Sequence, residues 1–161
     1  PIVIALGPGF TAGVDCHAVV ETKRGHDLGR VFYEGSAAEN TGIPGDVAGY
    51  TAARIIRAPC DGTFHPVVKI GDRVSAGDLV ARVGEFPVFV EISGVIRGIL
   101  PYGCPVHKGM KSGDVDPRCE LRHCYTVSDK ARGIGGGVLE AVLALRQKVH
   151  IPCEDQQLSQ I

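Results

Sequence analysis

Acidic and histidine side chains are concentrated in the first third of the chain, where they could bind a divalent metal or transfer protons. The candidate metal ligands are Asp15, His17, Glu21 and His26, and Asp27 would join them in an acid–base site. Carboxylate oxygens and imidazole nitrogens are common ligands of divalent metals. Because alternate residues of a strand point to opposite faces, Asp15, His17 and Glu21 can share a face that the loop residues need not reach. We therefore favour a solvated face and predict no metal site.

A glycine-rich segment, residues 7–13, follows a run of five apolar residues at positions 2–6. The apolar run predicts a strand buried on both faces. A glycine-rich turn after such a strand can present backbone N–H groups to an anion. Its spacing matches neither GxGxxG nor a P-loop, and Pro8 lacks an N–H donor. We therefore interpret the segment as a tight turn, with anion binding as the alternative.

Cysteine and histidine also occur close together near the end of the chain. Cys119, His123 and Cys124 supply three potential zinc ligands, and Cys104 or His107 would be the fourth. Structural zinc sites usually contain two cysteine pairs with spacings of two to four residues, whereas this single pair is five residues apart. We therefore predict a surface connection. The six cysteines show no disulfide framework, so we expect reduced thiols in the cytoplasm.

The residues before this connection, Asp114, Asp116 and Arg118, invite an internal ion pair. An exposed pair would contribute only about 0–1 kcal/mol. Stability alone is therefore a poor reason for it.

A pattern of glycines and valines occurs twice between residues 58 and 118. The equivalent pairs, each 32 residues apart, are Gly62 and Gly94, Gly71 and Gly103, Val74 and Val106, and Gly77 and Gly109; Val67 and Val68 likewise map onto Ile99 and Leu100. Glycine suits tight turns because it adopts φ > 0 at little cost. The short Val- and Ile-rich runs between the turns are typical of strands. Two copies are too few for a solenoid, so we predict two interlocked hairpin halves around one core.

The first copy contains APCDG at residues 58–62 and IGDRV at residues 70–74, and the second contains ISG at residues 92–94. These motifs resemble the barrel-sandwich hybrid of biotinyl and lipoyl carrier domains. In those carriers the modified lysine lies on the exposed hairpin between the halves, which here is GEFP at residues 84–87 and has no lysine. Met110 and Lys111 imitate a biotin-site dipeptide but lie in the closing turn of the second half. We therefore expect no covalently bound cofactor.

The composition is that of an ordinary globular protein, with 44% hydrophobic and 22% charged residues. A formal net charge of −1 argues against sequence-independent nucleic-acid binding, which needs clustered Lys and Arg. No apolar run is long enough to cross a membrane, and no export signal is visible. The chain opens at Pro1 inside an apolar run, so we expect a fragment that lacks an N-terminal part.

We predict a mainly β fold with one C-terminal helix. Residues 1–57 form a β-rich glycine-loop segment, residues 58–118 form the barrel-sandwich hybrid, and residues 119–161 form a connection and a helix that packs back on the N-terminal segment. Within the first segment, residues 14–22 and 29–35 predict an antiparallel hairpin.

The helix has clear local signals. Ser128 is a typical N-cap, and Pro152 should end the helix before a polar tail. Four glycines between residues 133 and 137 should interrupt it, because each costs about 1 kcal/mol in a helix interior; they would instead allow close approach of another backbone or a ligand. The predicted apolar face is Val138, Leu139, Val142, Leu143 and Leu145.

Seven segments have a further resemblance in common. They are residues 4–15, 24–31, 35–37, 41–45, 113–118, 128–131 and 135–141. Together they resemble the C-terminal half of the YqeB-type selenium-dependent molybdenum hydroxylase maturation proteins, up to about Leu145. Members of that family begin with a nucleotide-fold-like region that this chain lacks. The resemblance implies an accessory protein that handles or inserts the molybdenum cofactor, or its selenium-containing form, for a client hydroxylase.

The resemblance also implies where an anionic pterin cofactor would bind transiently. The expected cofactor-binding residues are Gly7, Gly9, Thr11 and Gly13 of the loop, with Arg24, Arg30 and Lys130 as counter-charges. The expected partners are the client hydroxylase and the protein's own N-terminal domain. Two alternatives stay open. One is a metal-dependent or acid–base enzyme completed by the missing N-terminal domain, and the other is a lipoyl- or biotinyl-type carrier modified at Lys111.

Overall fold

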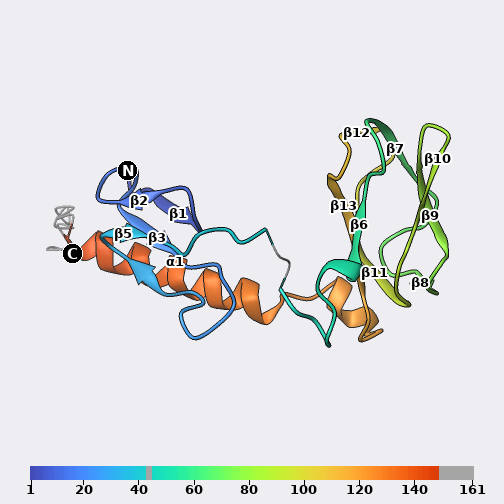
Figure 1. The fold of residues 1–161 in the computed structure, drawn as a ribbon. Helices are drawn as coiled ribbons and strands as arrows, with labels where there is room; N and C mark the ends of the chain where they lie inside the picture. Colours follow the sequence, from blue (N-terminus) through green and yellow to red (C-terminus); the bar gives the residue numbers. More distant parts are fainter. Residues whose placement is uncertain (43–44, 149–161) are drawn as a thin grey trace, which may run out of the picture. The chain divides into compact units, whose positions relative to one another are not determined.

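The computed structural model describes residues 1–42 and 45–148, which form two compact units (Figure 1). Unit 1 combines residues 1–41 with the segment that starts at Ser128, and unit 2 comprises Gly42–Val127. The predicted boundaries lie after residues 57 and 118. The structure shifts both, because residues 55–57 pair with a strand of unit 2 and residues 121–124 pack on another.

Unit 1 is a three-stranded sheet with a helix on one face. Its elements are β1 (Ile4–Leu6), β2 (Thr11–Ala12), β3 (Ala18–Val20), β4 (Val31–Phe32), β5 (Gly35–Ser36) and α1 (Asp129–Lys148). Strand β3 is central, parallel to β1 and antiparallel to β4, while β2 and β5 form a separate pair. The predicted hairpin is therefore confirmed. The prediction that the first strand is buried on both faces is wrong, since Leu6 is 51% exposed; β3 is the fully buried strand.

Helix α1 begins as predicted and then departs from the prediction. The Ser128 hydroxyl accepts the Ala131 N–H at 3.1 Å, which is the expected N-cap contact. The helix is continuous through the glycine run, so the predicted interruption is wrong. A Cβ on Gly137 would collide with the Gly29 carbonyl oxygen, and one on Gly29 would collide with Gly133. The glycines therefore let the helix approach the chain at residue 29 more closely than any side chain would allow.

The buried face of α1 also differs from the predicted one. Gly137, Ala141 and Leu145 are buried, whereas Leu139 and Leu143 are 59% and 54% exposed. Small residues face the sheet because the helix lies close to it. The predicted stop at Pro152 and the polar tail lie outside the described residues, and no described helix is long and apolar enough to cross a membrane.

Unit 2 consists of two four-stranded sheets around one core. Its strands are β6 (Ile55–Arg57), β7 (Gly62–Pro66), β8 (Arg73–Val74), β9 (Leu79–Val83), β10 (Phe86–Phe89), β11 (Gly94–Ile99), β12 (Cys104–Val106) and β13 (Lys111–Asp116), with short 3-10 helices η1 (Ala52–Arg54) and η2 (Leu121–Cys124). One sheet has the order β6-β13-β11-β8 and the other β10-β9-β7-β12. Strands β6 to β9 thus recur in order as β10 to β13, each in the opposite sheet.

The hydrogen bonds at the turns repeat with the same offset. The Gly71 N–H donates to the Ile96 carbonyl at 2.8 Å, and the Gly103 N–H donates to the Phe64 carbonyl at 2.9 Å. In the same way Gly77 bonds to Val90 and Gly109 to Ala58, both at 2.8 Å. All four glycines have positive φ. The mainly β fold with a C-terminal helix is therefore confirmed, and the duplicated halves interlock as predicted.

One detail of the predicted duplication is wrong. The Val67 N–H bonds to the Val80 carbonyl, but the equivalent bond in the second copy is made by Leu100 to Ser112. Val67 therefore corresponds to Leu100 and not to Ile99. The register of β11 against β13 shifts between Ile96 and Gly98, so strand β11 contains one extra residue at Arg97. The matching pairing of β7 with β9 is regular.

Candidate functional site

A polar cluster lies on the outer face of the β6-β13-β11-β8 sheet. Ile96 and Val115 belong to the core, so Asp114 and Asp116, on either side of Val115 in β13, point to the opposite face. The extra residue in β11 forms a β-bulge, which commonly re-aims a side chain near a functional site. The bulge directs Arg97 toward Asp116, and the two side chains are 3.7 Å apart.

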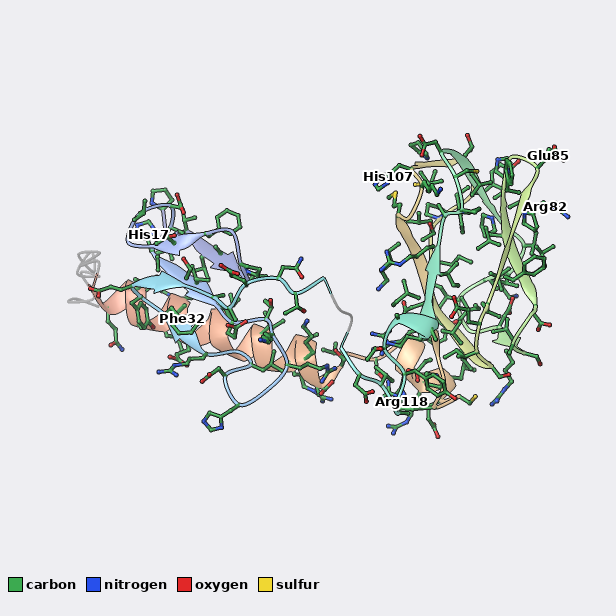
Figure 2. The ribbon with its side chains drawn as sticks, in the orientation of Figure 1. His17, Phe32, Arg82, Glu85, His107 and Arg118 are labelled. Carbon is green, nitrogen blue, oxygen red and sulfur yellow. The ribbon has the colours of Figure 1, made fainter. Side chains whose placement is uncertain are left out.

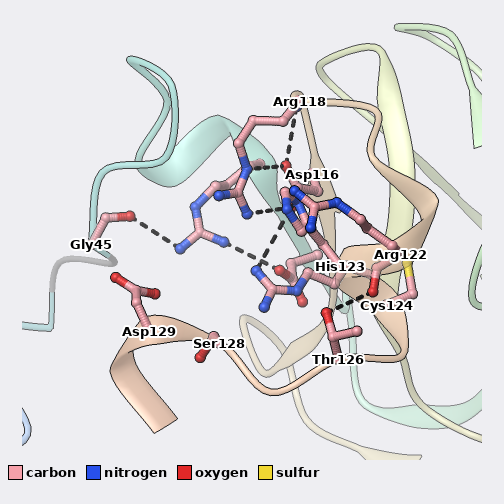
Figure 3. Close-up of polar contacts among 12 residues, drawn as sticks. Gly45, Asp116, Arg118, Arg122, His123, Cys124, Thr126, Ser128 and Asp129 are labelled. Carbon is pink, nitrogen blue, oxygen red and sulfur yellow. Dashed lines mark hydrogen bonds and ion pairs between the residues drawn. The ribbon is translucent and has the colours of Figure 1, made fainter. Parts of the chain in front are cut away.

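Asp116 is the centre of this cluster (Figure 3). Its carboxylate is 2% exposed and accepts three hydrogen bonds from Arg118, from the backbone N–H at 3.0 Å, Nε at 2.9 Å and Nη2 at 2.7 Å. Hydrogen bonding to the Arg118 guanidinium holds the pKa of Asp116 below its ordinary value, although burial opposes this shift. His123 Nδ1 is 3.8 Å from Oδ2 of the same carboxylate.

A second ion pair adjoins the first. Arg54 Nη1 lies 3.2 Å from Asp114 Oδ2, with the two side chains 13% and 19% exposed. The same guanidinium donates to the Gly45 carbonyl at 3.1 Å. Two buried nitrogens, Arg54 Nε and His123 Nδ1, have no hydrogen-bond partner among the described residues. Buried polar atoms are rarely left without one.

The segment after β13 brings His123 to the cluster. The Tyr125 hydroxyl donates to the Ile70 carbonyl at 3.2 Å, and Cys124 Sγ lies 3.7 Å from the Ile96 carbonyl oxygen. Gly71 permits this packing, because a Cβ there would stand 2.9 Å from the Tyr125 hydroxyl oxygen. These contacts fix η2 over strand β11.

Further arginines border the cluster with longer contacts. Arg73 Nη2 lies 3.5 Å from the Cys119 carbonyl, and Arg122 Nε lies 3.7 Å from Glu120 with its side chain 75% exposed. The guanidinium groups of the cluster therefore outnumber its carboxylates. This excess of positive charge suits an anionic ligand.

The glycine loop of unit 1 uses its backbone donors internally. The Gly7 N–H donates to the Val20 carbonyl and the Gly13 N–H to the Cys16 carbonyl, each at 2.9 Å. The Thr11 N–H donates to the Asp15 carboxylate at 2.8 Å. A carboxylate of the chain thus occupies one position that a phosphate would take. These contacts match the interpretation as a tight turn.

Two of the three predicted counter-charges in unit 1, Arg24 and Arg30, have carboxylate partners. Arg24 bonds to both oxygens of Asp129, while Arg30 lies 3.1 Å from Asp27 and 5.6 Å from the centre of the Phe32 ring. Lys130 lies in the first turn of α1. A bound anion would therefore compete with Asp27 and Asp129. Arg24 and Arg30 therefore pair with different carboxylates.

Three of the four candidate metal ligands, Asp15, His17 and Glu21, accept backbone hydrogen bonds within unit 1. His17 Nδ1 accepts the Val3 N–H at 3.1 Å, and the buried Glu21 accepts the Lys23 N–H at 2.7 Å and the Ala38 N–H at 2.8 Å. Burial would raise the pKa of Glu21, but these backbone donors lower it by more. His26 is exposed.

No group of three or more His, Cys, Asp or Glu side chains in the described ranges could hold a metal ion. Cys119, His123 and Cys124 are included in that finding. The free thiols in the described part are Cys16, Cys60, Cys104, Cys119 and Cys124, and Cys153 lies outside it.

Sequence reasoning found only part of the cluster around Asp116. An ion pair between Arg118 and one of the two nearby aspartates was predicted, and the structure pairs Arg118 with Asp116. Arg54, Arg97 and His123 were missed as its companions. The break of the 32-residue offset at Arg97 points to them, but it becomes visible only once strand pairing is known.

Comparison with known proteins gives one strong relationship. No protein-family model matches the chain. The chain is 55% identical over 145 residues to the uncharacterized protein YqeB of Escherichia coli (strain K12), a match that covers 90% of this chain. The chain is a relative of YqeB. The match covers 27% of YqeB, so the chain spans little more than a quarter of the length of that relative.

Two solved structures show weaker similarity to this YqeB relative. An aspartoacylase family protein from Mesorhizobium loti has a TM-score of 0.36 and 15% identity, covering 40% of this chain and 23% of that one. The ectoine utilization protein EutE (DoeB) from Ruegeria pomeroyi has a TM-score of 0.33 and 20% identity, covering 51% and 26%. These similarities are too low to support a functional argument.

Proposed function

We propose that the chain is a binding module of an accessory protein that matures a selenium-dependent molybdenum hydroxylase. The maturation role rests on the resemblance to the YqeB-type maturation proteins. The observation that supports binding of an anionic cofactor or a client enzyme is the arginine-rich cluster at Asp116, in which positive charge is in excess over a buried carboxylate.

The geometry gives no support to the carrier alternative. The hairpin that bears the modified lysine in biotinyl and lipoyl domains corresponds to the β9–β10 turn, where Gly84 and Glu85 stand (Figure 2). Lys111 is the first residue of β13 and pairs with Arg57 of β6. A lysine within a sheet is a poor swinging arm. Intact-mass measurement of the purified chain should therefore show no lipoyl or biotinyl adduct.

The enzyme alternative would need the acidic and histidine group of unit 1. Asp15 and His17 are both engaged by backbone N–H groups, and Glu21 is buried. Metal analysis of the full-length protein separates this alternative from the binding module. Stoichiometric metal that is lost in both Asp15→Asn and His17→Gln would favour the enzyme.

The maturation role is tested in cells that make a selenium-dependent molybdenum hydroxylase but lack the full-length protein. We expect the hydroxylase to accumulate with reduced molybdenum or selenium content and low activity, and the intact gene should restore both. A molybdenum enzyme without selenium is the control for general cofactor supply. Hydroxylase with normal molybdenum, selenium and activity in these cells would refute the proposal.

A further inference from the structure

The two halves of unit 2 differ at one place that the duplication makes visible. In the first copy His65 pairs with Arg82 in a regular ladder, and the equivalent pair in the second copy is Gly98 with Asp114, so Arg97 is an inserted residue without a counterpart. In the second copy the ladder is broken by the bulge at Arg97. A bulge weakens a ladder locally, so its presence in only one copy indicates a local purpose.

The bulge brings Arg97 to a point that His123 also faces. Arg97 Nη1 and His123 Nδ1 lie 3.7 Å and 3.8 Å from the same atom, Asp116 Oδ2. Both distances exceed hydrogen-bond length, and Oδ2 already accepts Arg118 Nη2 at 2.7 Å. Asp116 therefore lies near Arg97 and His123 but accepts no hydrogen bond from these two nitrogens. His123 Nδ1 has no hydrogen-bond partner among the described residues.

The surrounding charge favours an anion over a cation. Arg54 and Arg118 each use one carboxylate of the cluster, Asp114 and Asp116 respectively. Arg97 is thus left as an additional guanidinium, 28% exposed and reachable from solvent. A guanidinium presents paired N–H donors that match the oxygens of a phosphate-like group.

We propose that Arg97 and His123 bind a tetrahedral oxyanion on the outer face of the β6-β13-β11-β8 sheet. Arg122, on η2 and 75% exposed, supplies further positive charge at the rim. The chemistry is that of a phosphate monoester or of a free oxyanion such as molybdate. The inference rests on the proposed function, since it names the part of an anionic cofactor that this chain would hold.

The test is calorimetric titration of the full chain with three probes: sodium phosphate, sodium molybdate and glucose 6-phosphate, with sodium chloride at equal ionic strength as the blank. We expect saturable binding of at least one probe. A phosphate monoester that binds at least as tightly as the free ions indicates a larger phosphorylated cofactor, whereas a preference for molybdate indicates the free oxyanion. No saturable binding of any probe would overturn the inference.

Three variants locate the site. Arg97→Gln and His123→Gln should each weaken binding at least tenfold. Arg82→Gln is the matched control, because Arg82 is an exposed arginine on the outer face of the other sheet; it should bind as the wild type does. Two site variants are used in case one of them fails to fold, and circular dichroism checks that each variant is folded. Unchanged affinity in both site variants, or an equal loss in Arg82→Gln, would contradict the assignment.

The outcomes separate this inference from the proposed function. Oxyanion binding that depends on Arg97, together with a hydroxylase that matures normally without the protein, leaves the site standing and removes the maturation role. A hydroxylase that requires the protein, together with no oxyanion binding, leaves the maturation role standing and overturns the site.

Discussion

Replacing Asp116 by Asn should destabilise unit 2 strongly. The substitution keeps the shape of the side chain but removes a 2% exposed carboxylate that accepts three hydrogen bonds from Arg118. Breaking a buried ion pair costs about 3–5 kcal/mol. Arg118 is 41% exposed and can turn to water, so we expect about 2–3 kcal/mol. For a unit of this size that corresponds to a fall in Tm of roughly 10–20 °C.

The pH dependence of the loss follows from the lowered pKa of Asp116. A carboxyl group whose pKa is lower in the folded protein than in the unfolded chain stabilises the fold at pH values above its pKa in the unfolded chain. This stabilisation is lost as the pH falls through its pKa in the folded protein. The ordinary value is 3.8. The difference between wild type and Asp116→Asn should therefore be full at neutral pH and should shrink below about pH 4.

Hydrogen exchange followed by mass spectrometry reports the stability of each unit separately. We expect faster exchange in peptides from β11 and β13 and unchanged exchange in peptides from β1 and β3. Asp27→Asn is the control, because its ion pair with Arg30 is exposed on both sides and should contribute less than about 0.5 kcal/mol. The reasoning would be refuted if Asp116→Asn lost no more stability than this control, or if its loss of stability did not depend on pH.

Four further predictions concern single residues. Glu21→Gln should destabilise unit 1 by about 1.5–3 kcal/mol in urea unfolding, and the loss should shrink in acid because the pKa of Glu21 is lowered. Gly137→Ala should destabilise unit 1 by about 1–3 kcal/mol, because its methyl group would collide with Gly29. Gly135→Ala should stabilise the helix by up to about 1 kcal/mol, because a Cβ at residue 135 would lie in open space. A change in unfolding free energy of the same sign in both glycine variants would contradict the packing. Lys111 should carry no adduct by intact mass.

Local signals in the sequence were sufficient for the repeated halves and for the start of the helix. Gly71 and Gly103 lie at equivalent turns, and both have positive φ. Because such turns favour glycine, the duplication of the fold appears in the sequence as glycines at a constant spacing. Ser128 caps a helix through atoms within three residues of itself. Such features depend on near neighbours, and composition and spacing report them directly.

Packing decided what local signals could not. The glycine run of α1 predicts a break by propensity, but the helix is continuous because Gly137 fits against Gly29, a residue more than a hundred positions away in sequence. The same close approach buries Ala141 and leaves Leu139 exposed.

The sequence by itself determined a mainly β chain built from two copies of one motif, with a capped helix at its end and without a lysine on the expected hairpin. Only the tertiary structure decided where its positive charge gathers. Arg54 of η1, Arg97 of β11 and His123 of η2 come from three separate segments. They meet at Asp114 and Asp116 because one β-bulge re-aims Arg97 and the two 3-10 helices pack against the paired strands. Contacts between residues so far apart in the chain depend on register, which no local spacing encodes.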